Sequence, residues 1–346
     1  MNRRLAALLA ALTVASLLLA DGRRFRVVTY NVENLFDTCH DAGKRDQEFL
    51  PGAERRWTSA RYRKKLADLA RTLAATGGSE PASLIGLCEV ENDSTLRDLT
   101  QRTMLRRLGY EYIVTRSPDA RGIDVALLFQ PGRFRVLDFR SLRVPYRAPD
   151  ERPTRDILWV AGLVPTGDTL DVFVCHLPSR AGGAARTESY RCRAAALLRS
   201  HIDSLTARRG KARVLIMGDF NDEPADRSLT RALGVRQPVP ASQEYTADPR
   251  ALYVLSATAK GREGVKGTYR YRGTWNRLDQ IIVSGSLLLP KEGFRTSAAN
   301  CQIVSPDFLL EPDATYGGVK PRRTYQGTFY HGGVSDHLPL AVDFFY

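Results

Sequence analysis

Eight short apolar runs, spread along the 346 residues, constrain the fold of this chain more than any other feature. Each has the length of a β-strand, and several are apolar on both faces, as buried central strands are. The runs are FRVVTY (25–30), SLIGLC (83–88), IDVALLF (123–129), DILWVAGLV (156–164), LDVFVC (170–175), RVLIM (213–217), LDQIIVS (278–284) and PLAVDFF (339–345). The pattern predicts β-sheets built from strands drawn from the whole chain.

Two stretches between these runs have helical spacing instead. In TSARYRKKLADLARTLAATGG, Leu66, Leu69 and Leu73 recur on one helical face, and two glycines follow. A second helical pattern runs from 187 to 209 and is closed by Gly210. Strands that outnumber helices along the chain predict sheets with helices packed outside them.

Two long stretches, roughly 236–275 and 286–335, are irregular and rich in Gly, Pro, Tyr and Arg. Loops of this length inside a compact domain are usually functional or disordered. Because the chain has no internal repeat and no linker, we expect residues 21–346 to form one domain.

Residues 1–20 have the order of a secretory signal peptide. Arg3 and Arg4 form a basic start, an uncharged apolar run follows, and Ala20 precedes a polar stretch. The run is somewhat short for a transmembrane helix, which needs about 20 residues. We therefore expect export to the periplasm or the exterior; an uncleaved membrane anchor is the alternative.

The chain is basic, with a formal net charge of +13. A basic surface attracts polyanions such as nucleic acid, anionic lipid or phosphorylated sugar. The alternative is an excess of charge spread over solvated faces, since no basic block dominates. The charge favours an anionic substrate without naming it.

The five cysteines fit no zinc-binding spacing, and an odd number cannot pair fully within one chain. Cys88 and Cys175 end apolar runs, where a buried thiol is expected. One disulfide stays open as an alternative in an oxidising compartment.

Polar side chains that can bind a metal or a phosphate lie at the ends of the predicted strands. One such residue alone is usually a turn or a cap, and Glu89 and Glu91 could cap a helix that begins near Ser94. As a set they exceed what stability requires, and we expect them to converge at one sheet edge. The set comprises Asn31, Glu33, Glu89, His176, Asp219, Asn221, Asp279, Asp336 and His337.

The chemistry of this set narrows the reaction. Carboxylate and amide oxygens are hard ligands suited to Mg²⁺, Mn²⁺ or Ca²⁺. Such a cation beside two imidazoles fits attack on phosphorus, where developing negative charge must be stabilised. The sequence has no P-loop or dinucleotide fingerprint, and neither Ser179 nor Ser335 lies in a nucleophile-elbow motif.

The motifs YNVENLFD, GLCEVEND, HLPSRAGG, MGDFND, NRLDQIIVS and GGVSDHLPL resemble, in this order, those of the endonuclease/exonuclease/phosphatase superfamily. Its members include DNase I-like nucleases, abasic endonucleases, sphingomyelinases and inositol polyphosphate phosphatases. The resemblance spans about residues 25–346. It implies an α/β (α+β) fold: a four-layered α/β/β/α sandwich of two mostly antiparallel sheets flanked by helices.

The resemblance also implies roles for the metal-binding positions. Glu89 resembles the principal metal-binding carboxylate. Asn31, Glu33 and Asp336 resemble its neighbours in the metal and phosphate shell, although many relatives carry Asp at the position of Glu33.

The remaining motif residues resemble the catalytic group. Asp219 would orient or deprotonate the attacking water, and Asn221 would hold a phosphate oxygen. His337 would contact the scissile phosphate while Asp279 orients its imidazole. His176 resembles the second active-site histidine of DNase I-like and sphingomyelinase-like members; abasic endonucleases have a tyrosine near this point.

Six loop residues are further candidates for contact with phosphate or substrate, each with a turn or a solvated loop as the alternative. Asp124 is also a candidate for orienting His176. The arginine and tyrosine near 323 lie in a stretch suited to stacking and phosphate contact. The six are Ser179, Arg180, Arg121, Asp124, Arg323 and Tyr325.

These observations predict an exported hydrolase of phosphate esters that depends on Mg²⁺ (or Mn²⁺ or Ca²⁺) and uses in-line attack of an activated water. A monomeric nuclease or related phosphodiesterase is favoured, with nucleic acid as the anionic substrate, no obligate protein partner and no stable membrane span after signal cleavage. The alternatives are a sphingomyelinase-like lipid phosphodiesterase, an inositol or sugar phosphate phosphatase, and a non-catalytic binding protein. The last is disfavoured because Glu89, Asp219 and His337 are all present.

Overall fold

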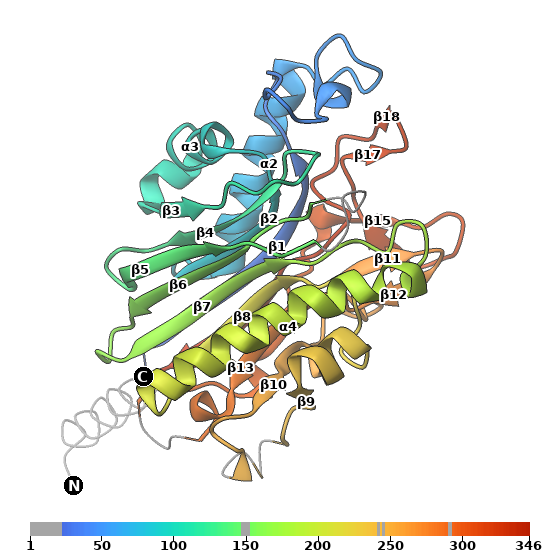
Figure 1. Ribbon diagram of the computed structural model, residues 1–346. Helices are drawn as coiled ribbons and strands as arrows, with labels where there is room; N and C mark the ends of the chain where they lie inside the picture. Colours follow the sequence, from blue (N-terminus) through green and yellow to red (C-terminus); the bar gives the residue numbers. More distant parts are fainter. Residues whose placement is uncertain (1–22, 147–152, 241–242, 244–245, 290–292) are drawn as a thin grey trace, which may run out of the picture.

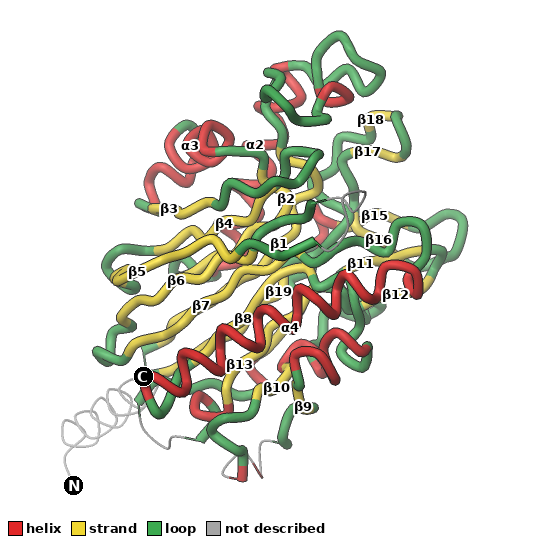
Figure 2. Tube along the Cα trace, in the orientation of Figure 1, coloured by secondary structure: helices red, strands yellow, loops and turns green. Residues whose placement is uncertain are grey.

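The computed structural model describes residues 23–146, 153–240, 243, 246–289 and 293–346. The predicted signal peptide lies outside these residues. Two β-sheets stack face to face, and helices cover their outer faces (Figures 1 and 2). This arrangement confirms the predicted four-layered sandwich.

The first sheet has six strands in the order β14-β19-β1-β2-β4-β3. Its central strands β1 and β2 are parallel, and every other neighbouring pair is antiparallel. The strands are β1 (Arg24–Leu35), β2 (Leu84–Val90), β3 (Glu111–Val114), β4 (Asp124–Phe129), β14 (Cys301–Ile303) and β19 (Leu340–Phe345).

The second sheet has seven strands in the order β5-β6-β7-β8-β13-β10-β9. Here β7 and β8 form the central parallel pair, β9 and β10 are also parallel, and the rest are antiparallel. The strands are β5 (Arg135–Leu142), β6 (Ile157–Leu163), β7 (Thr169–His176), β8 (Val214–Asp219), β9 (Val235–Arg236), β10 (Leu252–Val254) and β13 (Asp279–Ser284).

Within the described residues, three α-helices form the outer layers. Helices α2 (Ser59–Gly77) and α3 (Asp93–Gln101) lie on the first sheet, and α4 (Ala184–Arg209) runs along the second (Figure 1). Short helical segments connect the strands. They are η1 (Gln47–Phe49), η2 (Met104–Leu108), η3 (Ser228–Leu233), η5 (Leu255–Thr258), η6 (Gly285–Leu287), η7 (Ala298–Asn300) and η8 (Asp307–Leu309).

Both predicted helices form for the reasons that their sequences indicate. The Thr58 side chain caps α2 by accepting from the Arg61 backbone N–H, which satisfies one free donor of the first turn. The apolar stripe of α2 is buried against the first sheet. Helix α4 begins at Ala184, three residues before the predicted Thr187, because Gly183 ends the preceding loop at a φ that favours glycine.

The two sheets pack closely enough to require a glycine between them. A Cβ atom on Gly86 of β2 would lie 2.9 Å from the Met217 sulfur of β8, closer than side chains approach. The apolar faces of both sheets form one continuous core, and a second core lies between the second sheet and α4. This packing fixes the strand ends of one sheet against those of the other.

The two stretches predicted to be irregular contain short strands. Besides β10 and β14 they hold three hairpins, which the figures place beside the same end of the sandwich. Their strands are β11 (Tyr269–Tyr271), β12 (Thr274–Asn276), β15 (Leu310–Pro312), β16 (Val319–Pro321), β17 (Tyr325–Gln326) and β18 (Phe329–Tyr330).

All five cysteines carry free thiols, and Cys88 and Cys175 are buried as expected. Among the residues that the structure describes, no helix is both long enough and apolar enough to cross a membrane.

Candidate active site

Strand register brings the polar strand ends together. In the second sheet, His176 of β7 pairs with Asp219 of β8, and Asp219 pairs with Asp279 of β13. These three residues therefore stand side by side on neighbouring strands. In the first sheet, Asn31 of β1 pairs with Cys88 of β2, so Glu89 follows directly at the same end.

The backbone around these strand ends is unusual. Glu33, Asn34, Glu89 and Asn221 have φ angles of 50°, 54°, 67° and 51°, in the left-handed region that favours glycine. Such conformations cost about 1–3 kcal/mol each and persist where the surrounding structure imposes them. Because all four residues line one cavity, the strained turns point to a functional site.

That cavity, the reaction cavity, has a volume of about 670 Å³. It is lined by eight of the nine strand-end residues predicted from the sequence, and the ninth, Asp279, is hydrogen-bonded to one of them. The eight are Asn31, Glu33, Glu89, His176, Asp219, Asn221, Asp336 and His337.

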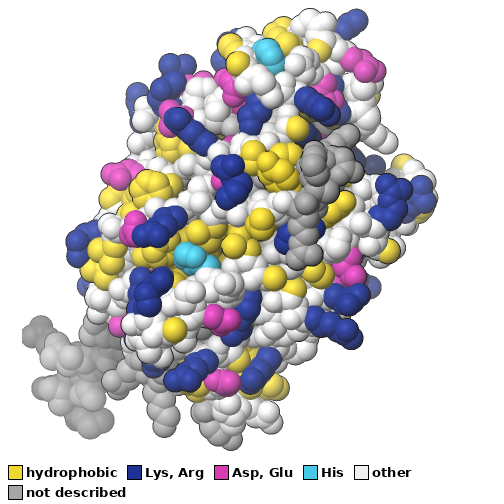
Figure 3. All heavy atoms as spheres, viewed as in Figure 1, with side chains coloured by type: hydrophobic (Ala, Val, Ile, Leu, Met, Phe, Trp, Pro, Cys, Tyr) yellow, Lys and Arg dark blue, Asp and Glu magenta, His cyan; other side chains and the backbone are white. Residues whose placement is uncertain are grey.

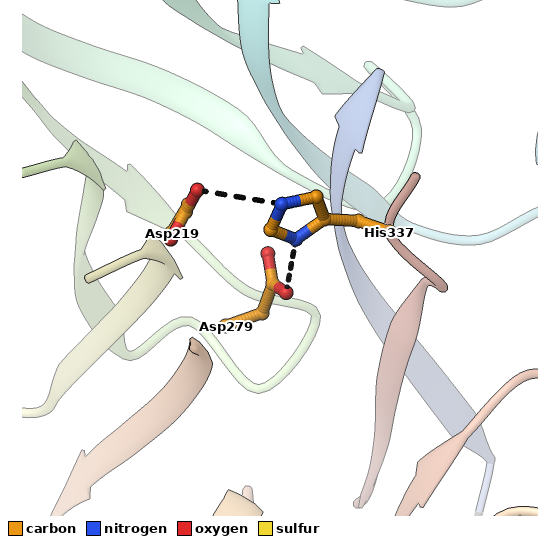
Figure 4. A group of neighbouring side chains, drawn as sticks. All are labelled: Asp219, Asp279 and His337. Carbon is orange, nitrogen blue, oxygen red and sulfur yellow. Dashed lines mark hydrogen bonds and ion pairs between the residues drawn. The ribbon is translucent and has the colours of Figure 1, made fainter. Parts of the chain in front are cut away.

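His337 lies between two carboxylates (Figure 4). Its Nδ1 donates to Asp279 Oδ2 at 2.7 Å, and its Nε2 lies 3.9 Å from Asp219 Oδ2. Burial opposes the charged imidazole, but the two carboxylates outweigh it and raise the pKa of His337 well above its usual value. His337 is therefore an imidazolium, held in orientation by Asp279.

Asp219 is buried and faces Nε2 of His337, the ring nitrogen that is not bonded to Asp279 (Figure 4). Asn31 Nδ2 donates to its Oδ2 at 3.0 Å, and the Asn221 N–H donates to its Oδ1 at 2.8 Å. Burial raises the pKa of Asp219 to about 7, against the opposing charge of His337. A carboxyl group with a pKa near neutrality is suited to accept a proton from water.

His176 is the second buried imidazole. Its Nε2 lies 3.8 Å from Glu89 Oε1 and 3.7 Å from Asp219 Oδ2, beyond hydrogen-bonding distance. Burial, with a smaller contribution from Arg155, lowers the pKa of His176 well below its usual value. It is therefore neutral, and its Nδ1 has no partner within the described part of the chain.

Three further carboxylates face the cavity, and arginines contact them. Glu89 Oε2 accepts from the Asn34 N–H at 2.9 Å, and Arg121 lies 3.5 Å from Glu89 Oε1. Arg323 donates to Asp336 at 2.8 Å and lies 3.7 Å from Glu33. The cavity thus collects acidic groups that need positive charge around them.

The chain matches the model of the endonuclease/exonuclease/phosphatase family over residues 26–345. It belongs to this family. As a member, it is a hydrolase of phosphoric esters, and its structure contains a buried Asp–His cluster.

Solved structures share the fold. An endonuclease/exonuclease/phosphatase family protein from Bacteroides thetaiotaomicron has a TM-score of 0.59 at 16% identity, covering 93% of this chain and 95% of that one. A mannosyl-6-phosphatase from B. thetaiotaomicron VPI-5482 gives 0.59 at 16%, covering 93% and 100%. D. rerio TDP2 complexed with a single-strand DNA product gives 0.54 at 14%, covering 93% and 99%. A search of curated proteins found no match.

Oxygen donors of this family member fit a hard cation. Asp219, Asp279 and His337 bring three ligand atoms within 4.8 Å of one another and could hold a metal ion. However, the 2.7 Å hydrogen bond between His337 and Asp279 leaves no room for an ion between those two groups, because a metal–ligand bond alone is about 2.0 Å long. The carboxylate of Glu89, with Asp336 and Asn31 nearby on the cavity wall, is the better-suited donor set.

Unlike a free metal ligand, Glu33 uses both carboxylate oxygens to accept hydrogen bonds from backbone N–H groups. Its Oε2 accepts from the Thr324 N–H at 2.6 Å, and its Oε1 from the Tyr325 N–H at 3.5 Å. Burial and the charge of Asp336 raise its pKa to about 7. Both oxygens of Glu33 therefore hold the segment before β17 against the first sheet.

Sequence reasoning missed Lys65, which is buried beneath this wall of the cavity. Its Nζ donates to Glu33 O at 3.0 Å, Thr324 Oγ1 at 2.6 Å and Val334 O at 2.5 Å. It thereby joins the end of β1 to the segment that carries Asp336. The available signal was its place one helical turn before Leu69, on the buried stripe of α2.

Four of the six loop candidates line the reaction cavity: Ser179, Arg180, Arg121 and Arg323. Arg180 is held by Asn221 O at 2.6 Å and by Asp226 at 2.6 Å, so it braces the loop after β8. The Asn221 side chain donates to Leu177 O at 3.0 Å, which leaves its second amide N–H for a phosphate oxygen.

The structure does not bring Asp124 or Tyr325 to the site. The Asp124 carboxylate accepts from the Ser117 N–H at 2.9 Å and faces another cavity, so it does not orient His176. Tyr325 is buried in an aromatic cluster, tilted against Trp57 with ring centres 5.9 Å apart.

Proposed function

We propose that the chain is an exported, divalent-metal-dependent phosphodiesterase that acts on nucleic acid. The observation that carries the proposal is the His337 imidazolium, held by Asp279 and facing Asp219, in a cavity with three more carboxylates. A fixed imidazolium that faces a carboxyl group with a pKa of about 7 suits attack of water on a phosphate ester.

In this mechanism the scissile phosphate lies between His337 and Asn221. His337 donates its Nε2 hydrogen to a phosphate oxygen and stabilises the charge that develops there. Asp219 accepts a proton from the attacking water, and Asn31 keeps the Asp219 carboxylate in position. Because Asp219 has a pKa of about 7, it can release that proton to solvent after each turnover.

A Mg²⁺ ion, or Mn²⁺ or Ca²⁺, would be held by Glu89 and Asp336 with Asn31 nearby. When bound, such an ion would supply positive charge to the phosphate oxygens. The donor chemistry fits because all these groups offer oxygen atoms. The arginines that contact Glu89 and Asp336 compensate the same charge.

Nucleic acid is favoured because the chain carries a net charge of +13. On the face drawn in Figure 3, Lys and Arg side chains are spread widely rather than gathered in one block. That distribution marks no single binding surface, so the net charge supports an anionic substrate without locating where it binds. The signal-like residues 1–20 support export.

The test is hydrolysis by purified residues 21–346 with Mg²⁺, Mn²⁺ or Ca²⁺. The substrates are plasmid DNA, RNA, sphingomyelin, inositol polyphosphates, mannose 6-phosphate and an aryl phosphodiester. We expect cleavage of DNA or RNA that EDTA, Asp219→Ala and His337→Ala each abolish. Turnover of lipid or sugar phosphate alone would overturn the substrate, and no turnover together with no cation binding would overturn the enzyme proposal.

A further inference from the structure

A second cavity, of about 460 Å³, adjoins the reaction cavity. The two share Arg121, Ser179 and Ala181 in their walls, so a molecule in one can extend into the other. Five arginines and two exposed tyrosines line the second cavity, which is called the arginine pocket below. These residues are Arg45, Arg121, Arg155, Arg186, Arg193, Tyr146 and Tyr190.

Among the described residues that line the arginine pocket, arginines outnumber acidic residues. Asp119 is the only acidic residue among the described residues that line it, and Arg155 contacts that carboxylate at 3.2 Å. Within the described ranges, no ion pair joins Arg45 or Arg186 to a carboxylate, and both side chains are exposed. A hollow in which positive charge predominates attracts anions.

The wall of the pocket also contains unsatisfied polar atoms. Arg155 is only 7% exposed; its Nη1 contacts Asp119 and its Nη2 donates to Leu177 O at 2.7 Å. Its Nε, and the buried Thr154 Oγ1, have no hydrogen-bond partner among the described residues. A buried donor without a partner costs about 1–3 kcal/mol, so an acceptor from a ligand or water is expected there.

The two tyrosines that line the arginine pocket also suit a ligand that carries phosphate. Tyr190 is 40% exposed and Tyr146 is 53% exposed, so both offer ring surface to the hollow. The Arg193 guanidinium lies 5.8 Å from the centre of the Tyr190 ring, which combines a cation with an aromatic face. Arginine with aromatic side chains is the combination that binds phosphate and stacks on nucleotide bases.

We propose that the arginine pocket binds a second phosphate group, carried by the same substrate as the phosphate that is hydrolysed. The inference rests on the proposed function and names its substrate class: phosphate esters with at least two phosphates. The second phosphate is either the next phosphodiester of a nucleic-acid strand or a terminal monoester on a small molecule.

The test compares substrates that differ only in the second phosphate. They are an aryl phosphodiester, the dinucleotide TpT, TpT with a 5′- or a 3′-terminal phosphate, and the trinucleotide TpTpT. We expect kcat/KM to be about tenfold higher with the second phosphate, as one charge-assisted hydrogen-bond network gives. A higher kcat/KM for TpTpT than for TpT identifies a nucleic-acid strand as the source of the second phosphate. A higher kcat/KM only for the terminally phosphorylated dinucleotides identifies a small molecule as the source.

Arg45→Ala and Arg186→Ala should remove most of that advantage and leave hydrolysis of TpT and the aryl diester unchanged. Arg208→Ala is the matched control, because it removes the same charge from the last turn of α4, away from both cavities. Equal losses for all substrates, or no advantage of a second phosphate in the unsubstituted enzyme, would overturn the inference.

A binding measurement separates this inference from the proposed function. Adenosine 3′,5′-bisphosphate is titrated calorimetrically into the unsubstituted protein, the Arg45→Ala, Arg186→Ala double variant and Arg208→Ala. We expect the double variant to bind it at least tenfold more weakly than the other two, whether or not the protein turns over any diester. Equal affinity in all three proteins would refute the pocket, whereas failure of the aryl diester assay alone would refute only the proposed function.

Discussion

The two sheets contain the same unit, a pair of central parallel strands joined through an outer helix. In the first sheet it is β1-α2-β2, and in the second it is β7-α4-β8. Each unit ends its strands at the reaction cavity, but with different chemistry. The first delivers Asn31, Glu33 and Glu89, and the second delivers His176, Asp219 and Asn221.

Each helix also contributes one buried cation near the ends of these strands. Lys65 of α2 donates to neutral oxygens, whereas Arg191 of α4 lies 2.7 Å from the Asp222 carboxylate. The second unit thus pairs Asp222, an acidic residue outside the catalytic group, with an arginine of its own helix. The corresponding acid of the first unit, Glu91, has no ion pair within the described residues, and burial raises its pKa to about 8.

The two units therefore contribute groups of different chemistry to the reaction cavity. The first keeps carboxylates that its own helix does not pair with a cation; the arginines that contact Glu89 and Glu33 come from loops outside the unit. The second balances its loop charges internally and holds a titrating acid beside an imidazolium.

The largest effect expected from this division is that of Asp219→Asn. Removing the group that accepts the proton should lower kcat by about 10³-fold with a smaller change in KM, as loss of a general base does. Steady-state kinetics on an aryl phosphodiester checks it. Excess Mg²⁺ should not restore the rate; restoration would mean that Asp219 serves the cation.

Glu89→Gln should lower the rate by about 10²-fold at low Mg²⁺, because it weakens the cation site of the first unit. In contrast to Asp219→Asn, raising the Mg²⁺ concentration should recover much of the loss. A Mg²⁺ titration of both variants tests the comparison directly. If Glu89→Gln shows no dependence on Mg²⁺, the assignment of cation binding to the first unit is wrong.

Lys65→Met should lower the free energy of unfolding by about 2 kcal/mol, because it leaves buried acceptors on Glu33, Thr324 and Val334 without a donor. Urea unfolding measures this. Arg63→Met, on the exposed face of the same helix, is the control and should change stability by less than about 0.5 kcal/mol. Equal effects would show that Lys65 does not brace the site.

Glu91→Gln should change how stability depends on pH. The pKa of Glu91 is about 8 in the folded protein and 4.5 in the unfolded chain, so folding takes up a proton between these values. The stability from this group is present in full below pH 4.5 and is lost as pH rises through about 8. Thermal melts should therefore show Glu91→Gln gaining stability over the unsubstituted protein from pH 5 to 9; a constant difference would contradict this.

Much of the fold was predictable because its central strands are apolar runs of strand length. Strand β5 was missed because charged and polar residues interrupt the apolar ones in RVLDFRSL, as expected of a strand with every residue exposed or half-buried. The short hairpins of 269–330 were missed for a related reason, because glycines, prolines and isolated aromatic residues have no strand periodicity.

The site residues were predictable as a set because all nine lie beside strand ends. Their partners were not. Lys65 lies 32 positions from Glu33 and 259 positions from Thr324 in the sequence, so only tertiary packing brings it into contact with them. Asp124 shows the opposite error: it stands at a strand entrance like the site residues, but its side chain points into a different cavity.

The site also lies at the junction of the two sheets. His337 precedes a strand of the first sheet and bonds to Asp279 of the second, and Asn31 of β1 bonds to Asp219 of β8. Each sheet alone holds half of the chemistry. We therefore expect activity to be lost once the two sheets separate, even if each sheet keeps the secondary structure that circular dichroism measures.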